Sequence, residues 1–292
     1  MSIKTLARSA LNGLLSLSAI RSRARGLGAR GLFPQRLWSG YPLREVIDIR
    51  MGPAHFRYEV VPGDYVGMPI YWQGLDAYEP ETVRLFPELV REARVFFDIG
   101  ASTGLFSLLA ASLNPDLRVR AFEPLPRAYD QLVRNIALND FSGRIEAINT
   151  AVGGTTGMAP FYVPEGIVPM SASLSGIGMH RPHRIAVAVD TIDNFCRMHP
   201  MPDLVKIDVE GLEHEVLEGM QDVIRQRQPA LILEVLSDAP FAALHSLLAG
   251  YRFGLITASG VRWQDTIEPS AGPERNWLCV SATNGAPHRL SD

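Results

Sequence analysis

The chain is poor in cysteine. It holds two, Cys196 and Cys279, among 292 residues, and they lie far apart in the sequence. Two residues at this distance form neither a disulfide framework nor a Cys-x-x-Cys pair. The cysteine content favours a reducing compartment, and we expect the protein in the cytoplasm.

The chain also lacks a long hydrophobic run. Although 47% of its residues are apolar, no stretch approaches the roughly 20 consecutive apolar residues that a transmembrane helix requires. Serine and asparagine interrupt the most apolar part of the N-terminal segment, and its charges follow that part, which argues against a secretory signal peptide. The composition is that of an ordinary globular protein with enough apolar residues for a core.

Acidic residues are absent from residues 1–44, which carry eight lysines and arginines, whereas the rest of the chain carries 20 basic and 31 acidic residues. Within residues 1–30, apolar residues at near-helical spacing precede a run of arginines. This pattern is compatible with a basic amphipathic helix that contacts the anionic inner face of a membrane, with a transit peptide, or with a solvated extension. The acidic remainder argues against a nucleic-acid partner, which requires a basic face.

From residue 95 onward, short apolar runs alternate with helical patterns. Strands are expected near residues 94–100, 118–124, 144–154, 203–211, 229–235, 251–257 and 276–282, and helices near residues 105–114, 126–140, 213–226 and 241–249. This alternation is typical of an α/β Rossmann-like fold, with a mostly parallel sheet between two layers of helices. We therefore expect four regions: an extension at residues 1–40, a strand-and-helix subregion at 41–94, the Rossmann-like domain at 95–284, and a polar tail at 285–292.

Polar residues stand where the predicted strands end. They are Asp98 with Gly100, Glu123, Asn149, Asp208 with Glu210, and Glu234. Ligands of open parallel sheets bind outside the carboxyl ends of the strands. The sequence therefore predicts a binding site built from these residues.

The loop at residues 100–104, GASTG, is open to three interpretations. A serine hydrolase with Ser102 as nucleophile requires a histidine after a late strand, and neither His245 nor His288 has that place. A dinucleotide site requires a glycine where Ser102 stands. S-adenosylmethionine, which has no pyrophosphate, requires a tight turn and a carboxylate for its ribose hydroxyls, and Glu123 follows the next strand. We favour S-adenosylmethionine, and an NAD-dependent oxidoreductase and a non-catalytic nucleoside-binding protein remain alternatives.

Five longer blocks carry a resemblance to a known family. They are VFFDIGASTGLFSLLAA, AFEPLPRAYDQLVRNIALN, INTAVGGTTG, VDTIDNF and LVKIDVEGLEHEVLEGM. In this order they resemble the FkbM-type methyltransferases, over roughly residues 75–282. The resemblance implies the class I methyltransferase fold with a seven-stranded sheet, S-adenosylmethionine as cofactor, and methylation of a hydroxyl on a sugar, glycan, glycolipid or natural-product scaffold. One departure is Ser102, where the family usually has asparagine.

The resemblance also implies roles for individual residues. Asp98, Gly100, Ser102 and Gly104 would contact the methionine end of the cofactor. Glu123 would accept hydrogen bonds from the ribose hydroxyls, and Asn149 and Ala151 would lie against the adenine.

Lys206, Asp208 and Glu210 lie beside the transferable methyl group in this scheme. If the strand continues through them, its alternation places all three on one face. Buried charges are costly unless they are paired or functional. We predict that Asp208 or Glu210 accepts the proton of the acceptor hydroxyl while Lys206 tunes the charge, with His214 as a reserve base. Simple pairing of Lys206 with Asp208 is the structural alternative.

Two further predictions concern this segment. Two close carboxylates are compatible with a divalent ion that holds a sugar diol, but no third ligand is evident, so we predict no metal site. The Asn-Pro-aromatic tetrapeptide of amino-methylating enzymes does not follow the strand. The acceptor is therefore expected to be a small molecule or glycan that is methylated on oxygen.

Overall fold

The structure, a computed structural model, describes residues 3–38, 40–163 and 183–283. The predicted polar tail lies outside the described residues. None of the helices in the described part of the chain has the length and apolar content needed to cross a bilayer.

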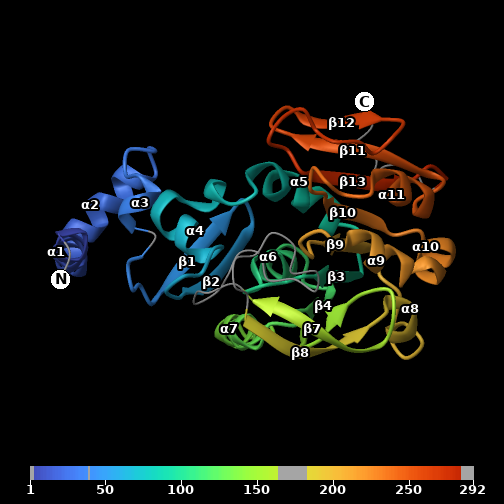
Figure 1. The fold of residues 1–292 in the computed structure, drawn as a ribbon, viewed down its shortest axis with the longest axis horizontal. Helices are drawn as coiled ribbons and strands as arrows, with labels where there is room; N and C mark the ends of the chain where they lie inside the picture. The colour runs from blue at the N-terminus through green and yellow to red at the C-terminus, as the bar shows by residue number, and fades with distance from the viewer. Residues whose placement is uncertain (1–2, 39, 164–182, 284–292) are drawn as a thin grey trace.

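The central sheet has eight strands in the order β12-β11-β13-β10-β9-β3-β4-β5 (Figure 1). Their bounds are β3 Val95–Ile99, β4 Arg118–Phe122, β5 Ile145–Ile148, β9 Leu204–Ile207, β10 Ala230–Glu234, β11 Tyr251–Thr257, β12 Gly260–Gln264 and β13 Asn276–Ser281. The five strands from β10 to β5 are parallel, whereas β13 runs antiparallel to β10 and to β11. The predicted Rossmann-like α/β fold is confirmed, with β12 as a strand that the sequence analysis did not expect.

Alternation along the strands divides the core between the two faces of the sheet. Phe96 packs in one hydrophobic cluster with the helices that precede β5, and its neighbour Phe97 packs in a second cluster with the later helices. The first cluster includes residues of α5 (Pro80–Val90) and α6 (Leu105–Leu113), and α7 (Pro126–Leu138) lies on the same side. The second cluster includes residues of four later helices: α8 (Ile192–Phe195), α9 (Glu213–Glu218), α10 (Gln221–Arg227) and α11 (Phe241–Leu247). Because both faces are covered, these strands are apolar on both sides.

The residues before β3 form a separate layer that packs on the first face. It consists of α1 (Ile3–Ser16), α2 (Ser18–Gly28), α3 (Gln35–Trp38), the hairpin β1 (Glu45–Met51) and β2 (Ala54–Val60), α4 (Gly67–Gln73) and the 3-10 turn η1 (Leu75–Ala77). Aromatic side chains join its parts, because the fully buried Trp72 contacts Phe33, Trp38 and Tyr41. Figure 1 shows α1 and α2 at the end of the molecule farthest from the central sheet.

A small sheet lies beside the domain, in the order β6-β8-β7 (Figure 1). Its strands are β6 (Ala151–Val152), β7 (Gly157–Val163) and β8 (His183–Asp190). The single strand predicted for residues 144–154 is therefore two strands, since β5 belongs to the central sheet and β6 to the small one.

Two predicted boundaries in the segment after residue 203 are wrong. The strand expected at residues 203–211 ends at Ile207, so Asp208 and Glu210 lie in a turn and do not share a strand face. The single helix expected at residues 213–226 is divided into α9 and α10 near Gly219. A Cβ atom at Gly219 would stand 2.2 Å from the carbonyl oxygen of Gly153. The backbone at Gly219 therefore packs closely against the turn after β6, and this contact lies at the break between the two helices.

Candidate active site

A cavity of about 270 Å³ lies at the carboxyl ends of β3, β4, β9 and β10, and we call it the strand-end cavity. Of the residues predicted for the site, it is lined by Gly100, Ser102, Glu123, Ala151, Asp208 and Glu210. The N-terminal layer closes it with Tyr65, Val66, Tyr78 and Glu79. Residues from both parts of the chain therefore form one pocket.

The loop after β3 requires glycine at its first position. Gly100 has φ +80°, and a Cβ atom there would stand 1.9 Å from the carbonyl oxygen of Asp208. The turns after β3 and β9 therefore touch through their backbones. Ser102 also adopts a left-handed conformation, with φ +49°. Asparagine is enriched in that region of backbone space, which explains why it suits this position in related sequences.

Glu123 is almost fully buried at the end of β4. Its two carboxylate oxygens accept the backbone N–H groups of Ser102, at 2.9 Å, and Leu125, at 2.7 Å. Burial outweighs these hydrogen bonds and raises the pKa of Glu123 to about 7. Each carboxylate oxygen can accept further hydrogen bonds, so Glu123 is able to receive hydroxyl donors from a ligand in the strand-end cavity.

Four predicted residues lie behind the cavity wall and do not line it: Asp98, Gly104, Asn149 and Lys206. Asp98 accepts a hydrogen bond of 2.6 Å from the Ser107 hydroxyl of α6. The side-chain amide of Asn149 donates to the Glu123 carbonyl at 2.8 Å. In this structure, these residues hold the turns that line the cavity.

Lys206 is the positive centre of the site. Its side chain is 3% exposed, and its ammonium nitrogen lies 2.8 Å from Asp208 Oδ2, 3.4 Å from Glu79 Oε1 and 4.7 Å from the centre of the Phe106 ring. The expected pairing of Lys206 with Asp208 is therefore present. Although burial opposes it, the attraction of Lys206 lowers the pKa of Asp208.

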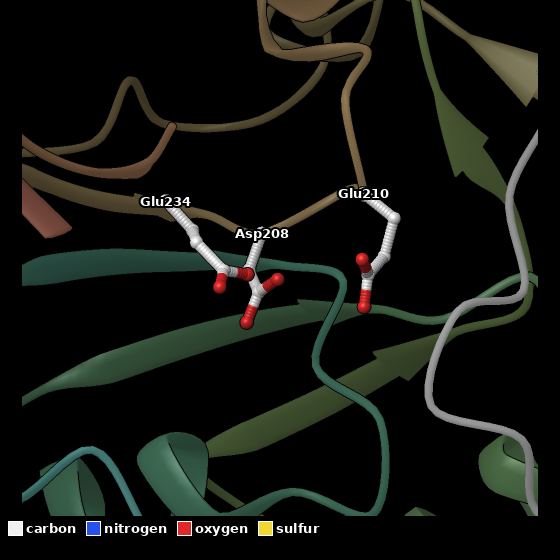
Figure 2. A group of neighbouring side chains, drawn as sticks. All are labelled: Asp208, Glu210 and Glu234. Atoms are coloured by element: carbon white, nitrogen blue, oxygen red, sulfur yellow. The ribbon is translucent and has the colours of Figure 1, made fainter. Parts of the chain in front are cut away.

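Asp208, Glu210 and Glu234 bring their carboxyl groups together, with one oxygen of each within 4.8 Å of the others (Figure 2). Asp208 and Glu234 share a hydrogen bond, and burial beside Asp208 raises the pKa of Glu234. The two groups therefore titrate as a coupled pair. The third carboxylate, Glu234 at the end of β10, was expected at a strand end, but the sequence analysis did not group it with Asp208 and Glu210.

Glu210, unlike Asp208, has no ion-pair partner within 4 Å among the described residues. Its backbone has φ +56°, and Gly211 follows with φ +98°, so the chain turns sharply at this point. Burial and the nearby Asp208 raise the pKa of Glu210 to about 7. A non-glycine residue in this region is strained by roughly 1 kcal/mol, and the turn directs the Glu210 side chain into the cavity.

Glu79 is the main site residue that sequence reasoning missed. Its backbone is left-handed, with φ +40°, and its side chain makes no cap for α5. Instead, its carboxylate pairs with Lys206 and accepts a 3.0 Å hydrogen bond from Asn276 of β13. The segment YEPETVRLF offered a signal, since Glu79 in it directly precedes a helix that begins with proline. Only the fold, however, brings Glu79 to the strand ends.

The serine hydrolase alternative for the loop receives no support from the cavity. No histidine is among the described residues that line it. Ser102 contributes its backbone N–H to Glu123, as described above.

Comparisons with known proteins agree with this geometry. A family model described as the methyltransferase FkbM domain matches residues 98–254, more than half of the chain. Methyltransferase sdnD of Sordaria araneosa is 30% identical over 156 residues, which are 43% of this chain and 60% of sdnD. The 31-O-demethyl-FK506 methyltransferase FkbM of Streptomyces tacrolimicus is 27% identical over 197 residues, 57% of this chain and 75% of that protein.

Hexuronic acid methyltransferase AglP of Haloferax volcanii is 26% identical over 155 residues, 50% of this chain and 58% of AglP. The matched segments thus span less than two thirds of sdnD and of AglP.

The buried charge of Lys206 yields a prediction about stability. Lys206→Met leaves Asp208 and Glu79 without their cation, so we expect the free energy of unfolding to fall by about 3–5 kcal/mol, measured by urea denaturation at pH 8. The loss should shrink as the pH falls, because protonation neutralises the two carboxylates. Arg225→Met is the control: it removes an exposed ion pair with Asp222 and should cost less than about 1 kcal/mol. Equal losses in the two variants would contradict the assignment.

Proposed function

Since the chain belongs to the FkbM methyltransferase family, we propose that it transfers the methyl group of S-adenosylmethionine to a hydroxyl of a sugar, glycan, glycolipid or natural-product scaffold. The observation that supports the proposal is that Glu123, which we assign to the ribose hydroxyls, and Glu210, a carboxylate without an ion-pair partner within 4 Å among the described residues, line the same strand-end cavity. Family membership argues against the oxidoreductase and the non-catalytic binder.

The residues of the cavity fit this cofactor. Glu123 offers carboxylate oxygens to two ribose hydroxyls, and the wall around it is apolar where Phe122, Leu125 and Ala151 line it. The carboxylates of Glu79 and Asp208 outnumber the single cation Lys206, which suits a positively charged ligand. Gly100 and Ser102 would contact the methionine end, and Asp98, Gly104 and Asn149 would hold those residues in place.

S-adenosylmethionine, when bound, supplies an electrophilic methyl group. The remaining chemistry of the reaction is to align an acceptor hydroxyl and to remove its proton. We assign that proton to a carboxylate oxygen of Glu210. A pKa near 7 matches a general base at neutral pH, whereas Asp208 is a weaker base because Lys206 and Glu234 stabilise its charge. Lys206 thus acts as a positioning residue that fixes Asp208.

The three carboxylates are assigned here to proton transfer and not to a metal ion. Lys206 already pairs with Asp208, and burial beside Asp208 raises the pKa of Glu234. A divalent cation would have to compete with the ammonium group for Asp208 and with a proton for Glu234.

We also propose a cytoplasmic protein that contacts the inner face of the membrane through residues 1–30. Leu14 of α1, Leu17 between the two helices and Ile20 of α2 are 52%, 55% and 37% exposed. Arg23 and Arg30 are exposed in the same segment. Apolar side chains beside exposed cations suit an anionic lipid surface.

The cofactor assignment predicts pH-dependent binding. S-adenosylhomocysteine should bind the wild type in calorimetry with full affinity above pH 7, and the dissociation constant should rise about tenfold per pH unit below the pKa of Glu123, because the protonated carboxyl loses its charge-assisted hydrogen bonds. Glu123→Gln should weaken binding by roughly 10–100-fold and abolish this dependence. Glu146→Gln, which replaces an exposed glutamate of β5, is the control. It should change neither the dissociation constant nor its dependence on pH. Unaltered binding by Glu123→Gln would refute the ribose contact.

The base assignment predicts a rate effect. Radiolabelled methyl transfer to a panel of hydroxyl acceptors identifies a substrate, and on that substrate Glu210→Gln should lower kcat by about 10²–10⁴-fold while S-adenosylhomocysteine affinity stays within about twofold. The wild-type kcat should rise with pH and level off above about 7, where Glu210 is ionised. Excess EDTA should leave the rate unchanged. If His214→Ala abolishes transfer and Glu210→Gln does not, the histidine is the base.

The membrane assignment predicts sedimentation of the full chain with vesicles that contain phosphatidylglycerol, but not with pure phosphatidylcholine vesicles. The double variant Leu14→Glu, Leu17→Glu should remain in the supernatant. Val133→Glu replaces an exposed apolar residue of α7 and should sediment like the wild type. Sedimentation of the double variant at the wild-type level would exclude contact through this surface.

A further inference from the structure

A second, larger cavity of about 760 Å³ adjoins the strand-end cavity, and we call it the outer cavity. Its walls come from the turn after β6, the first part of β7, the start of α9 and the loop after β10. Its size lies within the range of small-molecule sites. Nothing in the cofactor assignment uses it.

The two cavities meet at the turn after β9. Glu210 and Leu212 line both of them. The Glu210 carboxylate, which has no ion-pair partner within 4 Å in the described part of the chain, therefore lies at the junction of the space assigned to the cofactor and the outer cavity. A hydroxyl in the outer cavity could therefore reach the proposed base.

The turn that forms one wall of the outer cavity is held by its backbone. The N–H of Gly153 donates to the Asp190 carbonyl at 3.1 Å, and Gly219 allows the close contact with Gly153 described above. The Thr156 hydroxyl donates to Asp190 at 2.9 Å. Contacts within the protein therefore hold this wall in place.

The charged groups of the outer cavity all have one sign. Its described lining includes the carboxylates of Glu210, Glu215 and Asp238 and no lysine or arginine. The Nδ1 atom of His214, in the same lining, is buried and has no hydrogen-bond partner among the described residues. The described lining also contains the apolar side chains of Leu212, Leu236 and Pro240.

We propose, on the basis of the function proposed above, that the outer cavity binds the methyl acceptor and that this acceptor is a neutral or positively charged polyhydroxylated molecule. Hydroxyl and ammonium groups donate hydrogen bonds to the three carboxylates, and the C–H face of a sugar ring packs on the leucines and proline. A carboxylate or phosphate on the acceptor would meet like charges, with no lysine or arginine in the described lining to pair with, which selects against anionic sugars.

The test compares three sugars of one shape by saturation-transfer NMR on the full chain with saturating S-adenosylhomocysteine. Glucosamine and methyl glucoside should bind, and glucuronate should bind at least about tenfold more weakly than methyl glucoside, because it faces the three carboxylates. Asp238→Lys should reverse this order by strengthening glucuronate and weakening glucosamine. Asp265→Lys makes the same charge change at an exposed residue outside the cavity lining, and should preserve the wild-type order.

Two results would overturn the proposal: binding of glucuronate as tight as that of methyl glucoside, or binding of none of the three sugars while S-adenosylhomocysteine still binds. An Asp238→Lys variant with the wild-type order would overturn the location of the site. Failure of the proposed function is a separate result, since it appears as the absence of S-adenosylhomocysteine binding to the wild type in calorimetry.

Discussion

The site depends on the burial of one ammonium group among several carboxylates. Lys206 contacts Asp208 and Glu79 and lies over the Phe106 ring, so one charge connects β9 with α5 and α6. Without it, the carboxylates at the strand ends would repel one another in a medium where charges are poorly screened. Because they still outnumber the lysine, the pocket remains suited to a cation, which is the charge that a sulfonium cofactor brings.

Backbone conformation then separates the tasks of neighbouring acidic residues. Asp208 is fixed by Lys206 and Glu234, whereas the left-handed turn at Glu210 and Gly211 carries the next carboxylate away from the ammonium group. The same few residues therefore supply one carboxylate of lowered pKa and one of raised pKa. Opposite shifts in adjacent acids are a common basis for assigning a general base.

The N-terminal layer is part of this arrangement and not only a neighbour of the methyltransferase domain. It contributes Glu79 to the ion pair and Tyr65, Val66 and Tyr78 to the cavity wall. The fully buried Asp64 lies within 3.5 Å of the Thr103 hydroxyl, so the loop after β3 is supported from the same side. The shape of the strand-end cavity consequently depends on residues that precede the Rossmann-like domain.

The sequence by itself determined the order of strands and helices and the residues at the strand ends. Apolar runs and turn residues are local signals, and parallel strands place their carboxyl ends at one edge, so Gly100, Glu123, Asp208 and Glu210 could be expected together. Only the tertiary structure decided which acids are paired. Glu79 directly precedes α5, Lys206 lies on β9 and Glu234 ends β10, and their distances follow from the packing of those elements, which no local pattern encodes. The break between α9 and α10 and the end of β9 at Ile207 were also missed, because contacts with distant glycines and turns set them.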